Sequence, residues 1–182
     1  MGTHVALLRG VNVGGRKLAM ADLREIITTL GHADVSTYIQ SGNALFSTAR
    51  PDTAELAREI EKGIADRLGM DVGVIVLSRA DLGAMIAASP YADEPDPKTV
   101  HGVVMSTEPG SDLLARITAL PVTGGDSWHY DGRIIYLHTP GGFGRSDLAA
   151  RLLRQLSSPR SGLIATARNW ATMNTLLERL DR

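Results

Sequence analysis

A glycine-rich segment with three cationic side chains follows the first apolar run of the sequence. It covers residues 9–17 and reads Arg-Gly-Val-Asn-Val-Gly-Gly-Arg-Lys. Gly14 and Gly15 allow the backbone to direct amide groups into one concavity, and Arg9, Arg16 and Lys17 add positive charge. The segment therefore predicts an anion-binding loop. A flexible turn with solvated cations is the alternative interpretation.

The same segment departs from the phosphate-binding loop of nucleoside triphosphatases. That loop requires Gly-Lys followed by Ser or Thr, whose hydroxyl binds magnesium. Here Arg16 separates the glycines from Lys17, and Leu18 stands at the hydroxyl position. We expect no nucleoside triphosphatase.

A second polar segment, residues 40–43, reads Gln-Ser-Gly-Asn. Its first interpretation is a hairpin turn at Ser41-Gly42, because these residue types are typical of turns. Its amide and hydroxyl groups are also suited to hold a phosphate, a sugar or the edge of a base. Tyr38, just before it, could stack on a base, but an aromatic content of 4% favours a packed tyrosine.

Near the end of the chain, Arg168 precedes Asn169 and Trp170. Asn169 is expected to cap the last helix and Trp170 to start its buried face. This leaves Arg168 at a strand-to-helix junction, where it would pair with a carboxylate or a bound anion.

These segments together predict one polar site for an anionic or phosphorylated ligand, either a small molecule such as a nucleotide or a nucleic acid. Backbone amides and arginines would hold the anion, and polar side chains would orient the rest of the ligand. The predicted ligand-binding residues are Arg9, Asn12, Gly14, Gly15, Lys17, Gln40, Ser41, Asn43 and Arg168.

Two other functions stay open. The first is a metal-independent enzyme of unknown reaction that uses the same site, with Tyr38 or Lys17 as acid or base. The second is a protein-interaction module, because residues 140–182 carry seven arginines against three acidic residues. Catalytic residues are unknown, and no cofactor is expected. The absence of cysteine and the scattered spacing of the five histidines indicate no metal site.

Composition sets the class of protein. The 182 residues are 43% hydrophobic with a net charge of −1, which is sufficient for a real core and argues against a globally basic nucleic-acid binder. The first apolar run is too short for a signal peptide or a membrane span. We expect a cytoplasmic protein without membrane contact and make no prediction of oligomeric state.

Hydrophobic periodicity predicts the same order of elements twice, strand, helix, hairpin, helix, strand and an extra helix. The second hairpin would turn at Asp131-Gly132, and its unit would end with a strand over residues 162–166. The fold class is therefore α+β, a tandem duplication of a ferredoxin-like βαββαβ unit, each followed by an extra helix. The predicted domains are residues 1–90, a linker at 91–98, and residues 99–182.

Three segments, residues 9–17, 38–43 and 167–170, resemble the hallmark segments of a bacterial family, domain of unknown function 1697. The resemblance runs essentially the whole length of the chain. It implies two ferredoxin-like units, in agreement with the repeat, and it implies no established activity or catalytic residue.

Overall fold

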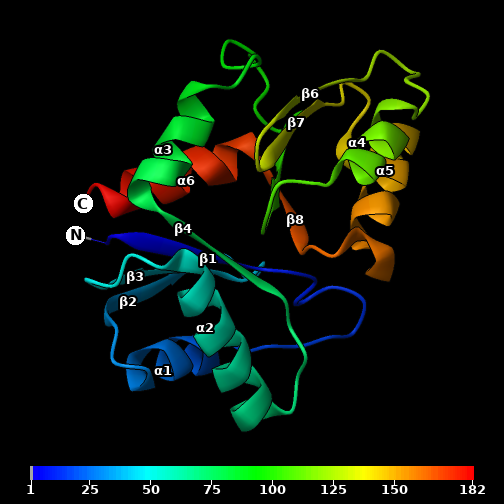
Figure 1. The fold of residues 1–182 in the computed structure, drawn as a ribbon. Coiled ribbons are helices and arrows are strands. Elements are labelled where there is room, and N and C mark those ends of the chain that lie inside the picture. Colours follow the sequence, from blue (N-terminus) through cyan, green and yellow to red (C-terminus); the bar gives the residue numbers. More distant parts are fainter. Residues whose placement is uncertain (1) are drawn as a thin grey trace. The chain divides into compact units, whose positions relative to one another are not determined.

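The computed structural model describes residues 2–182, which form two compact units with a sheet each (Figure 1). Unit 1 contains the described residues up to Ala84 together with Thr175–Arg182, and unit 2 contains Met85–Asn174. The last helix therefore begins in unit 2 and ends in unit 1. The domain boundaries expected from the sequence, at residues 91–98, stay a prediction.

Unit 1 is built on a four-stranded antiparallel sheet in the order β2-β3-β1-β4. Its elements are β1 (His4–Leu8), α1 (Met20–Thr29), β2 (Ala33–Tyr38), β3 (Asn43–Ser47), α2 (Thr53–Leu68), β4 (Val74–Ser78) and the start of α3 (Arg79–Ala87).

The helices α1 and α2 cover one face of this sheet (Figure 1). Buried residues of α2 recur at Leu56, Ile60 and Ile64, so one apolar stripe meets the strands. Asp52 caps the start of α2 by accepting hydrogen bonds from two backbone amides, and Gly69 ends it in the left-handed conformation. Local sequence signals therefore fix this helix at both ends.

Unit 2 repeats the arrangement, with a four-stranded antiparallel sheet in the order β6-β7-β5-β8 and helices α4 and α5 on one face (Figure 1). Its elements are β5 (Val100–Met105), α4 (Ser111–Thr118), β6 (Ser127–Asp131), β7 (Ile134–His138), α5 (Asp147–Ser157), β8 (Ala165–Asn169) and the start of α6 (Trp170–Leu180). Two single 3₁₀ turns, Phe143–Arg145 and Pro159–Ser161, flank α5.

Strand registers identify equivalent positions in the two sheets. His4 pairs with Ser78 in unit 1, and His101 pairs with Asn169 in unit 2. The next row across unit 1 is Leu45, Val5 and Leu77. The same row across unit 2 is Tyr136, Gly102 and Arg168. The two halves are thus similar in topology and differ in the chemistry of this row.

Both hairpin turns differ from the sequence prediction. In unit 1 the last pair is Tyr38 with Asn43, so the loop has four residues, 39–42, in place of the expected Ser41-Gly42 pair. In unit 2 Asp131 pairs with Ile134, which moves the two-residue turn to Gly132 and Arg133. Gly42 (φ +73°) and Gly132 (φ +54°) take the left-handed conformations that these turns require.

The last strand also lies later than expected. We predicted residues 162–166, but β8 pairs with β5 from Ala165 to Asn169. Arg168 is therefore a strand residue in the sheet, and the prediction of a junction position for it was wrong. Asn169 does cap the following helix, because its side-chain oxygen accepts a hydrogen bond from the Thr172 amide at 2.8 Å.

Candidate functional site

The segment after β1 folds as a small hairpin of its own. The Asn12 amide donates to the Arg16 carbonyl at 2.6 Å, and the Arg16 amide donates to the Val13 carbonyl at 3.2 Å. Gly14 (φ +58°) and Gly15 (φ +89°) stand at the two central positions, where a tight turn of type I′ needs left-handed residues. The glycine pair of the predicted anion loop therefore makes a turn that projects Val13 and Arg16.

Asn12 holds this hairpin in place. Its side-chain amide donates to the Leu18 carbonyl at 3.0 Å and to the Gln40 carbonyl at 2.6 Å, while its oxygen accepts from the Leu18 amide at 2.9 Å. Asn12 itself has φ +56°, a conformation that Asn tolerates better than other side chains. The asparagine thus ties the segment after β1 to the turn after β2.

A cavity of about 440 Å³ opens between these two segments in unit 1. This volume lies within the range of small-molecule sites. Its lining residues are Asn12, Gly15, Arg16, Lys17, Leu18, Ala19 and Gln40. Four predicted site residues, Asn12, Gly15, Lys17 and Gln40, therefore line one cavity, and we call it the loop cavity.

Neither cationic residue that lines the loop cavity forms an ion pair with a carboxylate in the part of the chain that the structure describes. Arg16 donates a hydrogen bond to the Asp71 carbonyl, which carries no net charge. Lys17 forms no ion pair within residues 2–182, and neither does Arg9, whose half-buried side chain lies just before the hairpin. Three other arginines of unit 1 are paired with carboxylates: Arg50 with Glu55 and Glu59, Arg67 with Glu25, and Arg79 with Asp181. Helix α1 starts beside the cavity without a side-chain cap on its first amides.

The polar side chain of Asn43 stabilises the turn after β2 itself. Asn43 is fully buried, and its side-chain amide donates to the Tyr38 carbonyl at 3.0 Å and to the Ser41 hydroxyl at 3.2 Å. A Cβ on Gly42 would lie 2.5 Å from the Val11 side chain, so only glycine fits. Ser41 and Asn43 do not line the loop cavity, and their structural role is to shape the turn that carries Gln40.

Ile39 is the strained residue of this turn. It has φ +51°, which is an outlier for a β-branched side chain and costs on the order of 1–3 kcal/mol. Its side chain is 49% exposed. The sequence did not point to Ile39, or to the lining residues Leu18 and Ala19, because their positions follow from turn geometry and not from residue type. Arg16 was expected to add charge to the loop, although it was not among the predicted ligand-binding residues.

Arg168 lies in unit 2 and is 7% exposed. Its guanidinium donates to the Thr166 hydroxyl at 2.8 Å and to the Ala167 carbonyl at 2.9 Å. Burial lowers the pKa of Arg168 to about 10, so it stays charged near neutral pH. The loop cavity is lined by unit 1 residues, so the structure does not group Arg168 with them.

Tyr38 is half-buried, and the Arg179 guanidinium lies 4.6 Å from the centre of its ring. This geometry is a cation–π contact that occupies one face of the ring. A base could therefore stack only on the other face.

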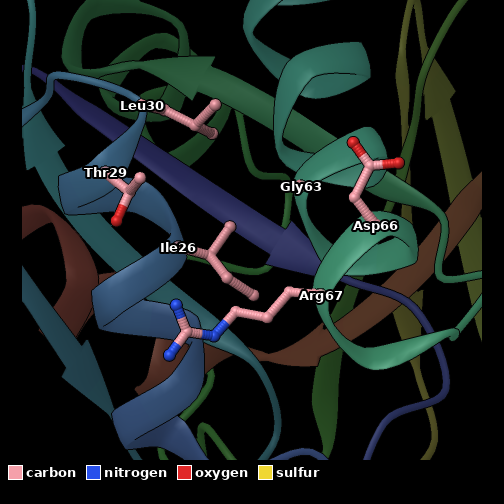
Figure 2. Close-up of a pocket in the computed structure, with 6 residues that line it drawn as sticks. All are labelled: Ile26, Thr29, Leu30, Gly63, Asp66 and Arg67. Carbon is pink, nitrogen blue, oxygen red and sulfur yellow. The ribbon is translucent and has the colours of Figure 1, made fainter.

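A second cavity of about 280 Å³ lies between α1 and α2 (Figure 2). Ile26, Leu30 and Gly63 give it an apolar floor. Its charged residues are already paired: Arg67 reaches across to Glu25 on α1, and Asp66 accepts from Lys62. This cavity therefore offers no free charge for a phosphate.

The histidines lie in aromatic contacts. His4 and His32 both pack on Phe46, and His101 stacks on Phe143 with ring centres 4.0 Å apart. Burial lowers the pKa of His101 to about 4. Within residues 2–182 no three His, Asp or Glu side chains gather as a metal ion would require.

A family model, protein of unknown function (DUF1697), matches residues 1–136. The chain belongs to the DUF1697 family. The match covers the whole segment after β1 and the turn after β2, so all residues that line the loop cavity lie inside the region that the family model matches.

A solved structure extends the likeness to the whole fold. The conserved bacterial protein SP0830 from Streptococcus pneumoniae is 24% identical to this DUF1697 protein, with a TM-score of 0.79 over 100% of this chain and 99% of that chain. At this identity the likeness shows a common mixed α+β fold. No curated protein matches the chain. None of the helices in residues 2–182 has the length and apolarity needed to span a bilayer.

Proposed function

We propose that this DUF1697 protein binds a phosphorylated small molecule in the loop cavity. The observation that supports this most strongly is the pair of cationic residues, Arg16 and Lys17, which line a ligand-sized cavity and have no carboxylate partner among residues 2–182. Cations at a preformed cavity favour an anion, and both Arg and Lys bind phosphate through strong charge-assisted hydrogen bonds.

The role of each predicted residue follows from its contacts. Lys17 and Arg16 contact the phosphate, and Arg9 adds to the positive field from just before the hairpin. Gly15 gives the ligand access to the backbone. Asn12 and Asn43 position the two segments, and Gln40 presents a side-chain amide with no hydrogen-bond partner within residues 2–182.

Isothermal titration calorimetry with pyrophosphate, ribose 5-phosphate and adenosine 5′-monophosphate tests the proposal. We expect at least one of them to bind, and Lys17→Ala and Arg16→Ala each to weaken binding about tenfold, the effect of losing one charge-assisted hydrogen bond. Lys98→Ala is the matched control, because Lys98 is an exposed lysine of unit 2.

Lysine labelling gives an independent readout. The chain has three lysines, Lys17, Lys62 and Lys98, and Lys62 pairs with Asp66. A bound phosphate compound should protect Lys17 from acetylation and leave Lys98 reactive. Absence of binding by all three compounds, or equal affinity of Lys17→Ala and the unchanged protein, would contradict the proposal.

We also infer that the two units arose by tandem duplication of a ferredoxin-like βαββαβ unit. The two sheets have the same strand order with equivalent strands in equivalent places. Equivalent pairs, His4 with Ser78 and His101 with Asn169, support the inference at the level of single residues.

A further inference from the structure

We propose that the phosphorylated ligand is a nucleoside phosphate, whose base contacts Val13 and Ile39 while its phosphate lies on Arg16 and Lys17. This inference rests on the proposed function and names the class of ligand for the same cavity.

Exposed apolar residues next to the lining residues in the sequence support a ligand with an apolar face. Among residues 2–182, three large hydrophobic residues are strongly exposed: Val13 at 60%, Ile39 at 49% and Val122 at 50%. Val13 follows the lining residue Asn12, and Ile39 precedes the lining residue Gln40. The hydrogen bond from Asn12 to the Gln40 carbonyl holds the two segments together. Two of the three exposed residues are thus direct sequence neighbours of residues that line a single cavity.

The backbone conformation of Ile39 supports the same inference. Glycine or asparagine would adopt φ +51° with less strain than a β-branched residue. Because 49% of its surface is exposed, Ile39 gains only part of the burial energy that could offset the strain. Strain at an exposed position is typical of residues kept for binding.

Gln40 supplies the polar complement. A nucleobase has two apolar faces and an edge of donors and acceptors, and a Gln side chain can donate to and accept from such an edge. Gln40 lines the cavity and directly follows Ile39 in the sequence. A nucleoside phosphate offers a partner for each of these groups. The face of the base would contact Ile39, its polar edge would bind the Gln40 amide, and the phosphate would bind Arg16 and Lys17. A sugar phosphate would leave Val13 and Ile39 uncovered.

Calorimetry on matched ligands and variants tests the inference. Adenosine 5′-monophosphate should bind at least tenfold tighter than ribose 5-phosphate, which lacks the base. Ile39→Gly and Gln40→Ala should each weaken adenosine 5′-monophosphate binding about fivefold and leave pyrophosphate binding unchanged. Ile39→Gly should not lower the urea midpoint of unfolding, since glycine accepts the same φ, and Val122→Ala should change nothing.

The outcomes separate the two proposals. In one outcome pyrophosphate binds and Lys17→Ala weakens pyrophosphate binding, but adenosine 5′-monophosphate binds no tighter than ribose 5-phosphate, or Ile39→Gly does not change adenosine 5′-monophosphate binding. The inference of a nucleoside phosphate is then wrong, and the proposed function stands. If none of the three compounds binds, both are wrong.

Discussion

The segments that follow β1 and β5 occupy equivalent places in the two units but differ in length and charge. Eleven residues, 9–19, separate β1 from α1, and they include Arg9, Arg16 and Lys17 without an acidic residue. Five residues, 106–110, separate β5 from α4, and their one charged residue is Glu108. The common fold therefore supplies the position, and the additional residues of unit 1 supply the cavity and its charge.

The sheets differ in the opposite sense. The row Leu45, Val5 and Leu77 of unit 1 is wholly apolar and buried. In unit 2 the same row contains Tyr136, whose hydroxyl donates to the Met85 carbonyl, and the buried Arg168. Polar chemistry thus lies in a loop of unit 1 and in the sheet of unit 2, so the two halves differ from each other in both layers.

The largest effect is expected when the sheet difference is removed. Leu77→Arg should lower the free energy of unfolding by about 4 kcal/mol, because it places a cation in a fully buried apolar position. Urea unfolding, monitored by amide hydrogen exchange in β1 and β4, measures this change in the free energy of unfolding. Both tryptophans, Trp128 and Trp170, lie in unit 2, so their fluorescence reports separately on that unit. A stable Leu77→Arg protein would show that the row tolerates charge in either half.

Asn12→Ala tests what holds the longer segment. The variant loses three hydrogen bonds and should cost about 2–3 kcal/mol at roughly 1 kcal/mol per bond. Hydrogen exchange at the Leu18 amide should rise with it, because its acceptor is the Asn12 side chain. Thr107→Ala, an exposed change in the shorter segment, is the control and should leave stability unchanged. Equal stability of the two variants would mean that the segment does not depend on Asn12.

The two segments should also respond differently to the loss of a glycine. Gly15→Ala puts a side chain at φ +89° and should cost about 1–2 kcal/mol. Gly110→Ala, in the shorter segment at φ −62°, should change stability by no more than ~0.5 kcal/mol. Neither added Cβ meets an atom within 4 Å, so the contrast isolates backbone conformation. Similar urea midpoints for the two variants would refute the assigned turn.

The smallest effect is a pH dependence in unit 2. The pKa of His101 in the folded state is about 4, below the ordinary value of 6.5, so the unfolded state binds the proton first as the pH falls. The stability contributed by neutral His101 should be complete above pH 6.5 and be lost as the pH falls toward 4. The expected loss is about 1 kcal/mol between pH 6 and pH 5. His101→Phe, followed by tryptophan fluorescence, should flatten this slope, and an unchanged slope would assign it to other groups.

Sequence patterns predicted the elements well where local signals are strong. The helix α2 has an Asp cap, a regular apolar stripe and a terminal Gly, and each signal acts within a few residues. The positions of β8 and of both hairpin turns were predicted incorrectly. Pairing with β5 extends β8 through Arg168, a residue that burial preference alone would exclude from a sheet. No residue-type preference predicts a left-handed Ile39.

The candidate site was predicted in outline from its cations and glycines. Lys17, Gly15 and Gln40 were placed on one site from chemistry, and they line one cavity. The contacts of Asn12 and Asn43 with backbone carbonyls could not be inferred, because they depend on which turns the two segments adopt. Ligand contact by any of these residues stays a prediction.

The division of α6 between the units has a consequence for synthesis on the ribosome. Unit 1 includes Thr175–Arg182, where Leu180 is buried and Asp181 pairs with Arg79. Domains of a nascent chain usually fold in order from the N-terminus. Here the sheet of the first unit is complete by residue 78, yet its last segment emerges only after all of unit 2. Unit 1 would therefore complete its folding only after unit 2 has been synthesised. Removal of the last eight residues should lower the stability of unit 1, although most of that unit is synthesised first.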